Sequence, residues 1–229
     1  MDTGVSEETI DVTVRLFAML RERAGTGSLE LRLAAGTTVE QALARVAEQG
    51  GLGALLERLP VRTAVNRDYA DAATVLCAGD ELALIPPVSG GAPAERAETA
   101  RQALVTAEPL SHERVRAAVA DRRAGAVVVF EGVTREVEAL EYEAYVEMAE
   151  RRIAEILGAC IERHGLVAAA AEHRTGRVAL GEPSVIVAVS AAHREEAFAG
   201  AREAIDEIKA QAPIWKREDR GEGPGEWVG

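Results

Sequence analysis

The two lysines of the chain are the first residues whose type and spacing could do chemistry. Lys209 and Lys216 are the only lysines among 26 basic residues, and they stand seven positions apart. Arginine keeps its proton in proteins, whereas a lysine in a partly dry site beside other cations can act as an acid, a base or a nucleophile. The pair is therefore a candidate for acid, base or nucleophilic chemistry. The alternative, two solvated surface lysines, stays open at this point.

Three further cations stand where an anionic ligand could be held. Arg135 follows a predicted strand, and His193 and Arg194 open a predicted long helix. A helix N-terminus has free N–H groups and a positive dipole end, so a histidine and an arginine there favour an anion. The alternative is solvated basic residues among many carboxylates. The pair His173 and Arg174 is more typical of a structural role.

A third candidate is the dipeptide Gly90-Gly91. Glycine lacks a Cβ atom, so a diglycine tail can thread a narrow active site. A plain flexible linker is the alternative. The element order before the dipeptide, and the Pro-Pro-Val-Ser run directly ahead of it, favour a presented tail.

Composition limits the classes of protein. The 229 residues are 48% hydrophobic and 28% charged, which is typical of packed globular domains. The net charge of -12 and the pI of about 4.9 argue against nucleic-acid binding, so an anionic ligand needs a local cationic cluster. The sequence shows no signal peptide and no apolar run long enough to span a membrane, which predicts a cytoplasmic protein.

The two cysteines are not expected to do the chemistry. Cys77 and Cys160 lie far apart, without a CxxC motif or metal-ligand spacing. Both are interpreted as buried, inert thiols. The sequence contains no metal-ligand set, and neither a bound metal nor a cofactor is expected.

The elements that must position these residues form two groups. The first follows the order strand, strand, helix, strand, strand, which predicts a small β-grasp domain. Its main helix is expected to begin at Thr37, with Glu40 in capping-box spacing. The predicted strands cover residues 10–17, 29–33, 61–65 and 81–85.

The second group predicts an α+β domain with an antiparallel sheet. Alanine-rich residues 92–107 are interpreted as a linker, which gives domains at 1–91 and 108–229. Helices are predicted at 111–122, 145–164 and 193–211, and strands at 124–131, 140–145, 167–173, 177–180, 184–191 and 214–218.

Together these residues resemble the two subunits of molybdopterin synthase. Residues 1–91 resemble the small subunit, a ubiquitin-like sulfur carrier, and the chain from residue 108 on resembles the large, catalytic subunit. The first resemblance rests on Val14–Glu22, Val65-Asn66 and Gly79–Gly91. The second rests on Gly125–Arg135, Leu140–Tyr145, Met148, His173–Gly176, Ser190–Arg194, Ala197-Phe198, Lys209 and Ala212–Glu218. The last motif is the most specific, whereas thiamine-pathway carriers share the β-grasp pattern.

The resemblance implies a reaction. A thiocarboxylate on the terminal glycine of the carrier supplies two sulfurs to cyclic pyranopterin monophosphate, which gives the dithiolene of molybdopterin. It also implies that Lys209 and Lys216 are catalytic, and that Arg135, His193 and Arg194 hold the phosphate and the pterin. An adenylating, sulfur-loading enzyme would charge the tail. The family's active form is a dimer of large subunits with one carrier at each end.

One feature departs from that pattern, because Ala92 follows Gly91 and leaves no free carboxyl group. We expect cleavage after Gly91, which would release a mature carrier. Alternatively, the fused domain is only a docking module and a separate carrier supplies the sulfur. Two other classes also stay open: a non-enzymatic interaction protein, and a thiamine-type carrier with an unrelated partner domain.

Overall fold

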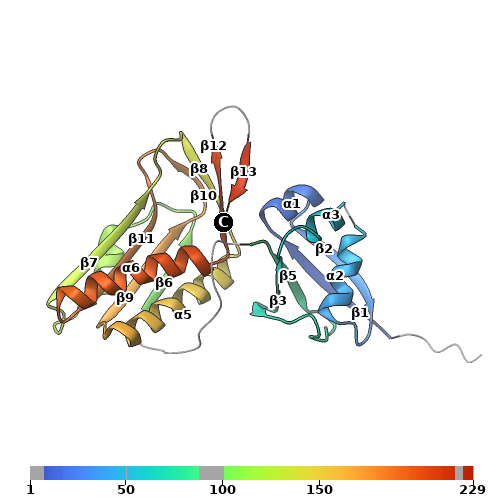
Figure 1. Cartoon of the computed structure of the whole chain (residues 1–229), viewed down its shortest axis with the longest axis horizontal. Coiled ribbons are helices and arrows are strands. Elements are labelled where there is room, and N and C mark those ends of the chain that lie inside the picture. Colours follow the sequence, from blue (N-terminus) through green and yellow to red (C-terminus); the bar gives the residue numbers. More distant parts are fainter. Residues whose placement is uncertain (1–7, 50, 88–100, 220–223, 229) are drawn as a thin grey trace, which may run out of the picture. The chain divides into compact units, whose positions relative to one another are not determined.

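The computed structural model describes residues 8–49, 51–87, 101–219 and 224–228, which fall into two compact units (Figure 1). The first unit ends at Pro87, and the second contains the described residues from Arg101 on. No helix in these ranges is both long and apolar enough to cross a membrane.

In its described residues, the first unit is a five-stranded mixed sheet covered by a helix. The sheet order is β2-β1-β5-β3-β4, in which β1 and β5 run parallel and the other pairs run antiparallel. Alternation along β1 buries Ile10, Val12, Val14 and Leu16 beneath the main helix. The predicted β-grasp fold is confirmed. Its elements are β1 (Thr9–Leu16), α1 (Ala18–Ala24), β2 (Ser28–Ala34), α2 (Val39–Ala47), α3 (Gly53–Leu56), β3 (Arg62–Val65), β4 (Asp68–Tyr69) and β5 (Glu81–Ile85).

The start of α2 corrects the predicted cap by one residue. Thr38, not Thr37, is the N-cap, and it forms a capping box with Gln41. The hydroxyl of Thr37 instead donates to the carbonyl of Ala34 at 2.7 Å. Thr37 therefore stabilises the turn that leaves β2, and its neighbour caps the helix.

The described residues of the second unit form two four-stranded sheets and three helices, which confirms the α+β class. One sheet has the order β6-β9-β11-β7, and the other has the order β10-β8-β12-β13. Helices α5 and α6 pack together against one face of the first sheet, and α4 covers β9 and β11 on the other face (Figure 1). The elements are β6 (Arg101–Thr106), α4 (His112–Ala118), β7 (Ala126–Val133), β8 (Ala139–Ala144), α5 (Val146–His164), β9 (Ala168–Arg174), β10 (Gly176–Ala179), β11 (Pro183–Ala191), α6 (Arg194–Gln211), β12 (Ile214–Asp219) and β13 (Pro224–Val228).

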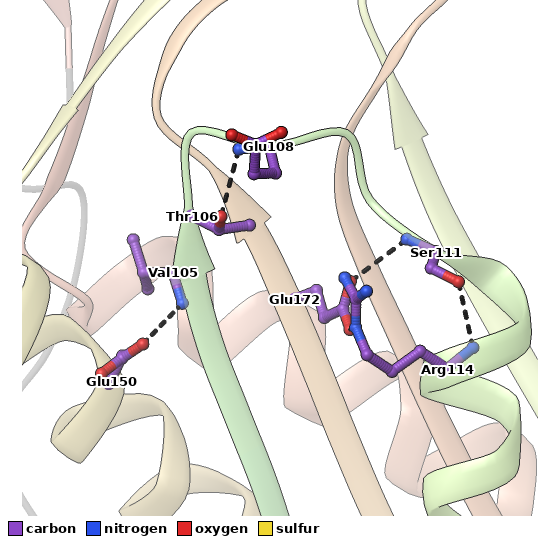
Figure 2. A network of polar contacts seen from close by, with 7 residues as sticks. All are labelled: Val105, Thr106, Glu108, Ser111, Arg114, Glu150 and Glu172. Atoms are coloured by element: carbon purple, nitrogen blue, oxygen red, sulfur yellow. Dashed lines mark hydrogen bonds and ion pairs between the residues drawn. The ribbon is translucent and has the colours of Figure 1, made fainter.

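Strand β6 was missed, because residues 101–106 were assigned to the linker. This strand pairs in parallel with β9, so the predicted antiparallel sheet contains one parallel pair. Val105 provides the reason, since its side chain is 6% exposed and packs into the core beside α5. Its N–H group also donates to Oε1 of Glu150 on α5 at 2.9 Å (Figure 2).

A buried carboxylate links α4 to the same sheet through hydrogen bonds (Figure 2). Glu172 on β9 is 2% exposed, accepts a hydrogen bond from Nη2 of Arg114 at 2.6 Å and another from the N–H of Ser111 at 3.2 Å. A buried charge needs such partners to be tolerated. Ser111 also caps α4 as predicted, although the helix ends at Ala118 and not near Arg122.

Candidate functional site

The second unit has a pocket of about 420 Å³. It opens where the end of β7, strands β8 and β12, and the last turn of α6 come together. The pocket is lined by Gly132, Val133, Arg135, Glu136, Val137, Leu140, Tyr142, His173, Ser184, Val185, Ile208, Lys209, Ala212, Ile214, Trp215, Lys216 and Glu218.

The structure brings the two lysines to this one pocket. Lys209 lies in the last turn of α6, and Lys216 lies on β12, where its Cα pairs with that of Tyr142 on β8. The chain leaves the helix at Ala212, whose backbone is extended ahead of Pro213, and enters β12 directly. The short connection explains how two lysines seven residues apart share a wall.

Arg135 adds a third cation to the pocket. It follows β7 by two residues, and its Nη1 atom lies 3.3 Å from Oε1 of Glu136. Both side chains are largely exposed, at 81% and 78%, so this surface ion pair is weak and leaves the guanidinium available to a ligand. Three cations thus line one pocket in a chain whose net charge is -12.

His193 and Arg194 do not reach this pocket within one chain. They stand at the N-terminus of α6, both exposed, whereas Lys209 stands near its C-terminus. Fifteen residues of helix at a rise of about 1.5 Å each put Arg194 roughly 22 Å from Lys209 along the axis. The predicted anion-binding set is therefore divided between the two ends of one helix.

His173 is a pocket residue that sequence reasoning assigned to structure alone. Burial lowers the pKa of His173 to about 4. The hydrogen bond to the carbonyl of Arg174 opposes this shift, and the charge of Lys209 adds to it. His173 pairs with Val185 across the sheet, at the end of β9 that borders the pocket. The segment His173–Gly176 is part of the family resemblance, but that resemblance gave His173 no role in the site, which is assembled from distant segments.

Tyr142 and Ser184 also line the pocket without having been predicted. Ser184 donates from its hydroxyl to the carbonyl of Gly132 at 3.1 Å, and burial raises the pKa of Tyr142, although a hydrogen bond with Ser184 opposes that rise. The register of β8 against β12 puts Tyr142 opposite Lys216. Strand pairing would have indicated Tyr142, but pairing is not readable from one sequence.

The cysteines differ from each other. Cys160 is buried as predicted, and burial raises the pKa of its thiol to about 11. Cys77 is exposed, so the prediction that it is buried was wrong. The neighbouring Leu76 takes the buried position, and the N–H of Cys77 donates to Oδ2 of Asp80 in a surface turn. Within the described ranges, no group of three or more His, Cys, Asp or Glu residues could hold a metal ion.

The predicted carrier residues Gly90 and Gly91 lie outside the described residues. Both glycines are, however, included in a match to a known protein family. The ThiS family model matches residues 14–91, so its match ends at the second glycine. The MoaE protein model matches residues 105–211, which include Lys209 and end before Lys216.

Two relatives of the second unit are named as catalytic subunits of molybdopterin synthase. The molybdopterin synthase catalytic subunit of Thermoplasma volcanium is 46% identical over 110 residues, which are 45% of this chain and 80% of the relative. Catalytic subunit 1 of Mycobacterium tuberculosis is 40% identical over 131 residues, 55% of this chain and 88% of the relative.

A solved structure agrees with these relatives. The molybdopterin synthase of Staphylococcus aureus superposes with a TM-score of 0.52 and 35% identity, over 58% of this chain and 99% of that chain. A non-enzymatic interaction protein and a thiamine carrier with an unrelated partner domain do not fit these matches. The chain therefore belongs to the MoaE family of molybdopterin synthase catalytic subunits, enzymes of molybdenum cofactor biosynthesis, and carries a ThiS-type sulfur-carrier domain ahead of the catalytic domain.

Proposed function

We propose that the pocket between α6, β8 and β12 is the site where two sulfurs pass from a carrier thiocarboxylate to cyclic pyranopterin monophosphate, forming the dithiolene of molybdopterin. The observation that carries this proposal is the meeting of Lys209 and Lys216 in one pocket of a chain that has no other lysine. In this account both lysines are catalytic.

The chemistry of the pocket suits a phosphorylated substrate whose ring must open. Arg135 can hold a phosphate through paired N–H donors, which a planar guanidinium supplies better than an ammonium. The lysines can then give and take protons while the cyclic phosphate opens and each sulfur replaces an oxygen. The apolar wall, which includes Leu140, Ile208 and Ile214, gives a flat pterin ring a surface to lie on.

His193 and Arg194 complete the site only from a second copy of the chain. One helix separates them from Lys209 by roughly 22 Å, so a role in phosphate or pterin binding requires a homodimer. Among the strands that the structure describes, β7 is at the edge of its sheet, and it exposes Val127, Val129 and Val133 to between 39% and 47%. Such an apolar edge favours pairing between copies.

The first unit would be the sulfur carrier of the same enzyme, with its domain ending at Gly91. Cleavage between Gly91 and Ala92 would free the carboxyl group that an adenylating, sulfur-loading enzyme then converts to a thiocarboxylate. The alternative is that the fused domain serves only for docking while a separate carrier supplies sulfur. Both versions assume a cytoplasmic protein.

A conversion assay tests the proposal. The purified chain is incubated with cyclic pyranopterin monophosphate and a thiocarboxylated carrier of residues 1–91, and molybdopterin is measured. We expect Lys209→Ala and Lys216→Ala each to lower turnover about a hundredfold or more, since a positioned proton donor or acceptor contributes about that much. Arg202→Ala, an exposed cation of α6, is the matched control. Variants that keep wild-type turnover would contradict the assignment.

A further inference from the structure

We infer that His173 is a specificity-determining residue of the pocket, whose Nε2 atom accepts a hydrogen bond from an N–H group of the pterin ring while the cations hold the phosphate. This inference rests on the proposed function and extends it. It gives the pocket two separate tasks, one for each end of the substrate.

The imidazole ring has a fixed orientation. Nδ1 of His173 lies 2.8 Å from the carbonyl oxygen of Arg174. A carbonyl oxygen can only accept, so Nδ1 carries the hydrogen of this bond. The rings of His173 and Tyr142 also form a T-shaped pair, with centroids 5.1 Å apart and an interplanar angle of 72°. These two contacts leave Nε2 as the free end of the ring in a residue that lines the pocket.

The surroundings keep this ring uncharged. His173 is 7% exposed, and burial disfavours its protonated form. The charged groups that share its pocket wall are mostly cations: Lys209 on α6, Lys216 on β12 and Arg135 after β7, against Glu136 and Glu218. Arg174 is its neighbour in β9. With Nδ1 protonated and the ring neutral, Nε2 has a lone pair and no hydrogen.

The free lone pair complements the substrate in a way that the cations do not. Protonated lysine and arginine side chains can only donate, and a phosphate at neutral pH mainly accepts. A pterin ring carries N–H donors, which need an acceptor. Within the described part of the chain, the hydrogen bond to the carbonyl of Arg174 is the only one that the imidazole ring of His173 makes, so Nε2 remains available. A site built to pair a substrate N–H rejects ligands that lack it.

Two substitutions separate this role from a structural one. In His173→Asn the amide can still donate to the carbonyl of Arg174, as Nδ1 does, but it cannot reach the position of Nε2. In His173→Gln the longer side chain brings an acceptor to that position and gives up the short contact. If His173 has only a structural role, asparagine should therefore restore ligand binding. If it contacts the ligand in the pocket, glutamine should restore it.

The experiment measures two dissociation constants for the full chain, one for cyclic pyranopterin monophosphate and one for inorganic phosphate. We expect His173→Asn to weaken pterin phosphate binding about tenfold and to leave phosphate binding unchanged, as the loss of one buried hydrogen bond predicts. We expect His173→Gln to bind pterin phosphate within about threefold of the wild type. Circular dichroism reports whether each variant is folded.

Three results would overturn the inference. These are wild-type affinity in His173→Asn, equal weakening of both ligands, and rescue by asparagine but not by glutamine. If His173→Asn does not fold, His173→Gln alone decides. A tenfold weaker binding of pterin phosphate by His173→Gln would then also overturn the inference. A wild-type chain that binds phosphate but not the pterin phosphate would contradict the proposed function itself, and the inference would fall with it.

Discussion

The Nζ atom of Lys209 lies 5.8 Å from the centroid of the Phe130 ring. The last turn of α6 therefore meets β7 at the wall of the pocket, and the ammonium group rests near an aromatic face that attracts cations. This contact stabilises Lys209 at the pocket even though its side chain is solvent-exposed. The following predictions concern what the pocket does with that lysine and its neighbours.

Exchange of the lysines for arginines should remove activity although the charge is kept. Arginine does not release its proton in a protein, so Lys209→Arg and Lys216→Arg should each lower turnover about a hundredfold. Binding of inorganic phosphate should stay within about threefold of the wild type. Initial rates of molybdopterin formation check this prediction. Arginine variants with near-normal rates would mean that the lysines act as fixed charges only.

Two inactive variants should restore activity when they form a mixed dimer. If Lys209 of one copy and Arg194 of another share a site, a hybrid of Lys209→Ala and Arg194→Ala chains has one intact site. Random mixing should then give about a quarter of wild-type activity, since half of the dimers are hybrids. Co-expression of the two variants with different affinity tags provides the test. Activity no higher than that of each variant alone would argue against a shared site.

The pH dependence of stability should report the buried histidine. The pKa of His173 is lowered from its usual 6.5 to about 4, so the folded state binds this proton less tightly than the unfolded chain does. The contribution of the neutral His173 side chain to the free energy of unfolding is complete above pH 6.5. It falls by at most about 3 kcal/mol as the pH falls towards 4. Unfolding by urea across this window should show a shallower decline for His173→Gln. Parallel curves for the two proteins would refute the assignment.

Neither cysteine should carry the transferred sulfur. The Cys160 thiol is buried with a pKa of about 11, and Cys77 lies in the first unit, on the surface. Cys77→Ser and Cys160→Ala should keep turnover within about twofold. A maleimide should label Cys77 quickly and Cys160 only after unfolding. Loss of sulfur transfer in Cys77→Ser would show that a thiol intermediate is part of the reaction.

Local patterns predicted most of the elements, since each depends on near neighbours. Alternation indicated β1, and the helix predicted at 145–164 agrees with α5 to within one residue. Residues 101–106 were not predicted as a strand because their partner β9 lies more than sixty residues away, and only that pairing makes the segment a strand. A short strand beside an alanine-rich run has no local signal of its own.

The residues of the candidate site were also predicted only in part. Lys209, Lys216 and Arg135 were predicted from residue type and resemblance, and they line one pocket. His173 was not assigned to the site, because its position follows from the register of β9 and the packing of α6. The separation of Arg194 from Lys209 could have been foreseen, since both lie on one predicted helix whose length fixes their distance.

An intact mass spectrum of the protein purified from its own cells tests the central claim most directly, namely that one polypeptide supplies both the sulfur carrier and the synthase. The account predicts a fragment that ends at Gly91 with one oxygen of its carboxyl group replaced by sulfur, together with a second fragment that begins at Ala92. A single uncut, unmodified chain in cells that make the cofactor would contradict it. The first domain would then be a docking module, and the synthase would depend on another sulfur donor.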